Sequence, residues 1–137
     1  MALSFKKEER LCSRVTIEQL YADGHRLMAF PYSVQWMFVE RPATVTHHPD
    51  HPCQVLIVAP KRKFKHAVDR NRVKRLTREC FRLRKDLLYN FLDEHGINIV
   101  FSMVYVHNEI LTFDQLGHKM DKLLTVLQND IAKTLPS

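Results

Sequence analysis

The sequence predicts an α+β fold, in which helices pack on a small β-sheet. Three short segments are rich in β-branched and aromatic residues, which is typical of strands. Two longer segments repeat apolar residues at spacings of three and four, which is typical of amphipathic helices. With a further short helix near the start, the order along the chain is helix, two or three strands, helix, strand, helix. The 137 residues are expected to form a single domain, 1–137.

The first helix is predicted from Ser13 to Asp23. Ser13 or Thr16 can cap its start, because a hydroxyl oxygen accepts a hydrogen bond from an unpaired backbone N–H, and Gln19 stands three residues after Thr16. Gly24 suits the left-handed conformation that often ends a helix, so the helix is expected to stop there.

Two strands are predicted next. Tyr32 to Val39 alternates, and one side of this strand is strongly aromatic. Residues 41–52 carry three prolines and three histidines and are expected to form a loop. Gln54 to Ala59 has the β-branched composition of a short buried strand, which Pro60 ends.

The longest helix is expected from Ala67 or Asp69 to about Glu94, with Gly96 as its stop signal. A strand over 97–106 follows. Thr112 and Gln115 have the spacing of a capping box and predict the start of a C-terminal helix. Its expected apolar stripe comprises Phe113, Leu116, Met120, Leu123, Leu127 and Ile131.

Positive charge is concentrated around the longest helix. Residues 61–85 hold 12 of the 21 Lys and Arg and only two acids, so their balance is +10, whereas the other 112 residues (9 basic, 13 acidic) sum to −4. Charge this concentrated repels itself unless a polyanion shares it, so a nucleic acid is the expected partner. A solvated surface is the alternative, but solvated faces usually mix charges of both signs.

The helical periodicity separates this segment into two faces. The predicted apolar stripe comprises Val73, Leu76, Cys80, Leu83, Leu87 and Phe91. The predicted basic face comprises Asn71, Lys74, Arg75, Arg78, Arg82 and Lys85. One face can therefore pack on a core while the other follows a phosphate backbone, since Arg makes forked hydrogen bonds and Lys acts as a point charge.

Several classes of protein are not supported. The start of the chain shows no apolar signal-peptide stretch, no run approaches a membrane span, and three widely spaced cysteines give no disulfide framework, so the cytoplasm is the expected compartment and no membrane partner is expected. No catalytic constellation of protein side chains is evident, and Asp69 and Glu79 lie among cations. The segment His47 to Cys53 contains possible zinc ligands, but adjacent histidines rarely chelate one ion, so no metal site is predicted.

The basic helix carries a pattern that resembles the RNR signature of the bacterial ribonuclease P protein subunit. The similarity extends from Ala67 through Arg70-Asn71-Arg72 and Lys74-Arg75 to Arg78 and Arg82. The opening, Phe5 to Leu11, and the basic turn Lys61-Arg62-Lys63 also resemble that family. The resemblance spans nearly the whole chain.

The resemblance implies a fold and a function. The fold would be an α/β sandwich like the second domain of ribosomal protein S5, with the signature helix in a left-handed β-α-β crossover, an exception to the usual hand. The protein would be the RNA-binding subunit of ribonuclease P, binding the catalytic RNA and the 5′ leader of precursor tRNA. The RNA subunit would hold Mg²⁺ and carry the chemistry, with no cofactor on the protein and no obligate protein partner. The expected RNA-binding residues are Lys61, Arg62, Lys63, Arg70, Asn71, Arg72, Lys74, Arg75, Arg78 and Arg82.

The leader would lie in a cleft between the sheet and the N-terminal helix. The candidates for its lining are Phe5, Ile17, Tyr21, Tyr32 and Trp36. Aromatic residues can stack on bases, but an aromatic strand face more often packs in a core, and both possibilities stay open for Tyr21 and Trp36. Two other functions are considered: a structural ribosomal RNA-binding protein with an S5-like fold, and a DNA-binding module with the helix in a major groove.

Overall fold

The computed structural model describes residues 9–39 and 52–135. Four strands form one sheet in the order β1-β2-β4-β3, where β1 is His25–Ala29, β2 is Tyr32–Val39, β3 is Cys53–Val58 and β4 is Asn98–Tyr105. Neighbouring strands are antiparallel except β3 and β4, which are parallel. The predicted α+β class is confirmed, and β1 is a strand that the sequence analysis did not assign.

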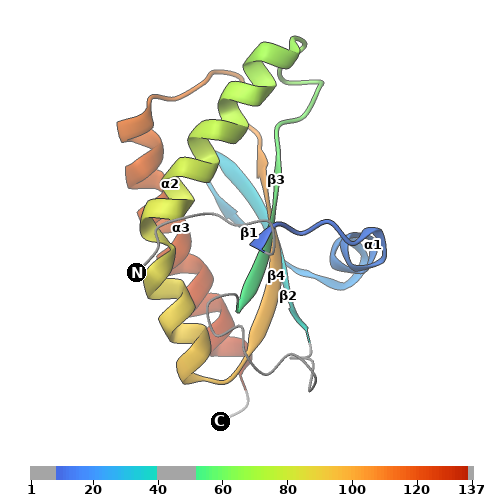
Figure 1. The fold of residues 1–137 in the computed structure, drawn as a ribbon, viewed down its shortest axis with the longest axis vertical. Helices are drawn as coiled ribbons and strands as arrows, with labels where there is room; N and C mark the ends of the chain where they lie inside the picture. Colours follow the sequence, from blue (N-terminus) through green and yellow to red (C-terminus); the bar gives the residue numbers. More distant parts are fainter. Residues whose placement is uncertain (1–8, 40–51, 136–137) are drawn as a thin grey trace.

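Helices cover the two faces of the sheet unequally. Figure 1 shows the sheet edge-on, with α2 (Ala67–Glu94) and α3 (Phe113–Thr134) on one face and α1 (Arg14–Asp23) alone on the other. Helix α2 connects the parallel strands β3 and β4 by a left-handed crossover, as the resemblance implied (Figure 1). None of the helices in the described part of the chain is long and apolar enough to cross a membrane.

The main core lies between the sheet and the pair α2 and α3. Side chains that alternate along the strands fill it, because successive residues of a strand point to opposite faces. The strand residues in this core are Tyr32, Val34, Trp36, Cys53, Val55, Ile99, Phe101, Met103 and Tyr105. A smaller cluster of Leu11, Leu20, Met37 and Val100 lies on the other face, under α1.

The predicted limits of α2 are confirmed, but its buried face differs from the predicted stripe in its second half. Leu83 and Leu87 are exposed, the latter at 74%. Phe81, Leu88, Tyr89 and Leu92 are buried instead, together with Lys85. The stripe prediction was therefore right for Val73 and Cys80 and wrong for Leu83 and Leu87, because the contact face of this 28-residue helix shifts along its length as it crosses the sheet and α3.

The ends of the helices explain their limits. The Ser13 side chain accepts a hydrogen bond from the Thr16 backbone N–H, and Thr112 and Gln115 form the predicted capping box of α3. Gly96 has a φ of +63° and ends α2 as expected. The left-handed conformation predicted for Gly24 is wrong, since its φ is −68°. Gly24 is needed for space, because a Cβ there would lie 2.4 Å from the Leu20 carbonyl oxygen.

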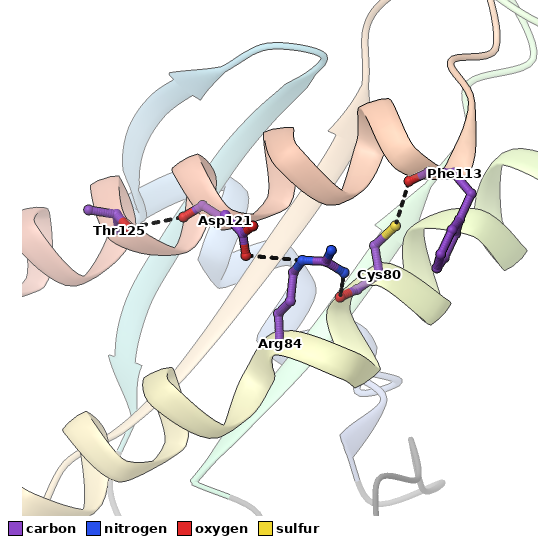
Figure 2. A network of polar contacts seen from close by, with 5 residues as sticks. All are labelled: Cys80, Arg84, Phe113, Asp121 and Thr125. Atoms are coloured by element: carbon purple, nitrogen blue, oxygen red, sulfur yellow. Dashed lines mark hydrogen bonds and ion pairs between the residues drawn. The ribbon is translucent and has the colours of Figure 1, made fainter.

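Polar contacts fasten α2 to α3 (Figure 2). Arg84 Nε of α2 donates to Asp121 Oδ1 of α3 at 3.0 Å, and the Cys80 thiol donates to the Phe113 carbonyl oxygen at 3.8 Å. Within α2, Arg84 Nη1 also donates to the Cys80 carbonyl oxygen at 3.4 Å. A Cβ at Gly117 would lie 2.5 Å from Arg84 Nη2, so the glycine makes room for this guanidinium. Arg84 therefore belongs to the helix–helix contact, although it lies within the basic segment.

Candidate nucleic-acid interface

The basic turn before α2 is held in place by its neighbours. The Lys63 and Phe64 N–H groups both donate to the Pro60 carbonyl oxygen at 3.1 Å, and the buried Phe64 ring packs against Tyr105 with centroids 5.7 Å apart. Lys61 and Arg62 are exposed, whereas Lys63 Nζ donates to Asn108 Oδ1 at 3.0 Å. The turn thus places three cations beside the start of the helix. Two of them are exposed, and the third, Lys63, is hydrogen-bonded to Asn108.

Arg70 has an architectural contact in addition to its charge. Its Nη1 donates to the carbonyl oxygens of Phe64 and Lys65, both at 2.9 Å. These bonds tie the first turn of α2 to the basic turn, so the two basic elements form one surface. Asn71 and Arg72, which follow directly, are exposed.

Further along α2, Arg75 and Arg78 lie near Arg10 of the N-terminal segment. Burial lowers the pKa of the Arg78 guanidinium, and the positive charges of Arg10 and Arg75 lower it further. Arg78 Nε is buried and has no hydrogen-bond partner among the described residues. Arg10 reaches this cluster because its segment runs beside β3, where the Leu11 N–H donates to the Val55 carbonyl oxygen at 2.9 Å. Guanidinium groups donate readily to phosphate oxygens, so this group of arginines is a candidate phosphate contact.

Sequence reasoning missed Arg10. The opening of the chain gives no periodic signal that would place it near α2, and its position depends on contacts with residues far along the chain. The only sequence signal for it was the resemblance of the segment Phe5 to Leu11 to the family's opening.

Two of the predicted basic-face residues already have acidic partners. Arg82 forms an ion pair with Glu79, which holds the pKa of that carboxyl below its usual range. Lys85 was predicted on the basic face and is buried instead, with its Nζ 2.5 Å from Glu9 Oε2. That prediction was wrong because the N-terminal segment covers this part of the helix. Arg82 stays partly exposed, and Lys74 and Arg75 lie on the face away from the core.

The other candidate surface is the sheet face beside α1. The helix covers only part of it: Ser33, Leu56, Val58 and Val104 on this face are half-buried, whereas the strand residues facing α2 and α3 are mostly fully buried. Tyr21 on α1 is 39% exposed, and its carbonyl oxygen accepts a hydrogen bond from Gln35 Nε2 at 3.5 Å. Ile17 packs half-buried against the cluster under α1.

Tyr32 and Trp36 lie on the opposite face of the sheet from α1. Both are fully buried in the main core, where the Tyr32 hydroxyl is 2.7 Å from Thr77 Oγ1 and Trp36 Nε1 donates to Asp130 Oδ2 at 2.7 Å. Strand alternation puts them under α2 and α3, so the prediction that they line a cleft beside α1 was wrong. Phe5 lies outside the described residues.

The described residues offer no ligand set for a metal ion. No group of three or more His, Cys, Asp or Glu side chains comes together among residues 9–39 and 52–135. The histidines of the segment His47 to Cys53 lie outside these ranges. Cys53 itself is buried in β3, where burial raises the pKa of its thiol to about 12.

Comparisons with known proteins agree on one family. A sequence profile of the family described as Ribonuclease P matches residues 5–128. The Ribonuclease P protein component of Porphyromonas gingivalis is 30% identical over 125 residues, covering 91% of this chain and 87% of the relative. That of Chlorobium phaeobacteroides is 27% identical over 128 residues, covering 88% and 86%.

Solved structures show the same fold. The RNase P protein of Staphylococcus aureus matches with a TM-score of 0.62 and 18% identity, covering 87% of this chain and 94% of that one. The RNase P protein from Thermotoga maritima matches with a TM-score of 0.61 and 20% identity, covering 85% and 94%. On the profile match and the curated relatives, this chain belongs to the ribonuclease P protein family, and it is a protein subunit of an RNA-processing ribonucleoprotein.

Proposed function

We propose that this chain binds the catalytic RNA of ribonuclease P with the basic turn, the outer face of α2 and Arg10, and that it assists removal of the 5′ leader from precursor tRNA. The contacts are mainly to phosphates, because the face offers guanidinium and ammonium groups and few groups that would read bases. The turn and α2 act as one surface, since Arg70 ties them together.

The observation that carries this proposal is the arginine cluster. Burial lowers the pKa of Arg78, and the positive charges of the nearby Arg10 and Arg75 lower it further. Like charges that repel in the free protein are stabilised when a polyanion binds, because phosphates supply the opposite charge.

The leader of precursor tRNA is proposed to lie on the sheet face beside α1. That face is only partly covered, and Tyr21 stands exposed next to it. A single-stranded leader supplies bases for Tyr21 to stack on, and mature tRNA has no such extension. The protein would therefore favour the precursor over the product.

Magnesium is proposed to be held by the RNA. The described protein residues provide no carboxylate cluster for it, and a subunit with +10 in one segment can replace diffuse cations between two RNAs. Adding the protein to its cognate RNA should lower the magnesium concentration needed for cleavage, while the protein purified free of RNA should cut nothing.

The direct test is the salt dependence of RNA binding by a Lys74→Ala/Arg78→Ala double variant. Each phosphate contact removed should reduce the slope of log K against log salt by about 0.7–0.9. A Lys133→Ala variant is a matched control, because Lys133 is exposed at the end of α3. An unchanged slope in the double variant, with unchanged circular dichroism, would overturn the proposal for this face.

A further inference from the structure

Three chain segments meet at the end of the sheet where α2 begins (Figure 1). The turn between β1 and β2 is held to the loop after β4, because the Val106 N–H donates to the Pro31 carbonyl oxygen at 2.8 Å. The basic turn is held to the same loop by the hydrogen bond from Lys63 Nζ to Asn108 Oδ1. Residues far apart in the sequence therefore form one surface beside the start of α2.

Phe30 is the exposed aromatic residue of this surface. It is 47% exposed at the tip of the β1–β2 turn. His107 packs against it edge-on, with ring centroids 4.9 Å apart and an interplanar angle of 62°. Lys119 Nζ, from α3, lies 5.5 Å from the centroid of the Phe30 ring. The ring is thus held by an imidazole and a cation, and nearly half of the residue remains accessible.

The charge of the surface matches that of a nucleic acid. The three segments hold Lys61, Arg62 and Lys63 and one acid, Glu109, and Lys119 of α3 adds a cation beside Phe30. An accessible aromatic ring beside several cations is the combination that holds unpaired nucleotides, because the base stacks on the ring while the phosphate lies near the cations. A residue packed in the core would not be 47% exposed.

We propose that Phe30 stacks on an unpaired RNA base, with Lys119 and the basic turn binding the flanking phosphates. This site extends the α2 surface around the end of the sheet and rests on the proposed function, because it uses the same RNA. It is distinct from Tyr21, since the five residues of β1 place the turn roughly 16 Å from the end of α1, and it adjoins the end of the sheet face where Ser33 and Val104 pair. The nucleotide comes either from the catalytic RNA or from precursor tRNA, and the two are distinguished by experiment.

The test compares Phe30→Leu with Phe30→Trp. Affinity is measured first for ribonuclease P RNA alone, and then for precursor tRNA bound by the reconstituted holoenzyme. Loss of a base stack weakens binding by roughly five-fold to more than a hundred-fold. We expect Phe30→Leu to weaken binding at least five-fold, and Phe30→Trp to bind as well as the unaltered chain. A loss with RNA alone assigns the nucleotide to the catalytic RNA, and a loss only with precursor tRNA assigns it to the substrate.

Two controls match these changes. Phe38→Leu alters a phenylalanine that is 36% exposed at the far end of β2, and Lys133→Gln serves as the control for Lys119→Gln, about 21 Å along the same helix. Neither control should change affinity, whereas Lys119→Gln should reduce the salt slope by about 0.7–0.9. Melting curves verify that each variant folds.

Tryptophan fluorescence gives a readout that does not depend on affinity. The chain has a single tryptophan, Trp36, which is buried, so emission from a residue introduced at position 30 is distinguishable. Stacking should quench this emission when RNA binds. Unchanged emission in Phe30→Trp and unchanged affinity in Phe30→Leu would overturn the inference. If Lys74→Ala/Arg78→Ala still weakens binding in that case, the proposed function stands and only the Phe30 site fails.

Discussion

The buried ion pair between Glu9 and Lys85 permits a quantitative test of how the N-terminal segment is attached. The two residues are 1% and 4% exposed, and Lys85 Nζ lies 2.5 Å from Glu9 Oε2. The Tyr89 hydroxyl also donates to the same carboxylate oxygen. Replacing Lys85 with Met would leave the Glu9 carboxylate buried with its main countercharge removed, which typically costs about 3–5 kcal/mol of stability. Glu9→Leu should cost a similar amount, because it removes the carboxylate that faces the buried ammonium group.

The double variant Glu9→Leu/Lys85→Met should be far less affected than the sum of the single variants. It removes both charges and fills the site with side chains of similar size, which is often close to neutral. The Tyr89 hydroxyl then loses its carboxylate acceptor, which costs about 1–3 kcal/mol. The double variant is therefore expected to lose about 1–3 kcal/mol in total, compared with about 6–10 for additive effects.

Urea unfolding at neutral pH, followed by circular dichroism and by Trp36 fluorescence, measures the free energy of unfolding of four proteins. They are the unaltered chain, the two single variants and the double variant, which together form a double-mutant cycle. A domain of this size has a stability of roughly 5–15 kcal/mol, so the single variants should have strongly lowered midpoints. Lys85→Met should leave the salt slope of RNA binding unchanged, because Lys85 points into the protein. A loss below about 1 kcal/mol in Lys85→Met, or additivity in the cycle, would refute the reasoning.

Three further outcomes are expected. Tyr21→Ala should weaken holoenzyme binding to precursor tRNA by roughly 1 kcal/mol or more while binding of mature tRNA barely changes, and equal losses would instead mean that Tyr21 is a packing residue. In native protein at pH 8.5 a thiol reagent should modify the exposed Cys12 and spare Cys53, because burial raises the pKa of Cys53 to about 12. The Cys53 thiol of the unfolded chain ionises at the ordinary value of 9.0, so the free energy of unfolding should fall as pH rises from 9.0 toward 12. Gly24→Ala should reduce the melting temperature more than Gly96→Ala. The first change places a Cβ against the Leu20 carbonyl oxygen. The second meets open space, and its cost is only that of a positive φ for alanine, about 1 kcal/mol.

Local pattern was enough to predict several elements of the fold. The alternation of Tyr32 to Val39 gave the limits of β2, and the capping box at Thr112 gave the start of α3. These features depend on residues within a few positions of one another. The strand β1 was missed because HRLMA has no clean alternation, and its half-exposed position at the edge of the sheet requires none.

Long-range contacts decided what local pattern could not. Alternation shows that Tyr32 and Trp36 share a face but does not say which helices cover that face, so the leader-cleft prediction for them failed. Helical periodicity placed Lys85 with the basic residues, but a carboxylate 76 positions away in sequence determines its surroundings. The RNA-binding residues of the turn and the first half of α2 were easier to identify, because the charge pattern and the resemblance are both local.

The attachment of the N-terminal segment also affects the exposed edge of the sheet. β3 is an outer strand with the sequence CQVLIV, and an unpaired edge of this composition is a template for strands of other molecules. The segment at Arg10 and Leu11 pairs with Val55 in the middle of this edge, and Glu9 anchors it to α2. The buried ion pair thus keeps the N-terminal segment on the edge of β3, where it blocks the addition of strands from other molecules. A chain without this ion pair should aggregate at concentrations where the unaltered chain stays dispersed.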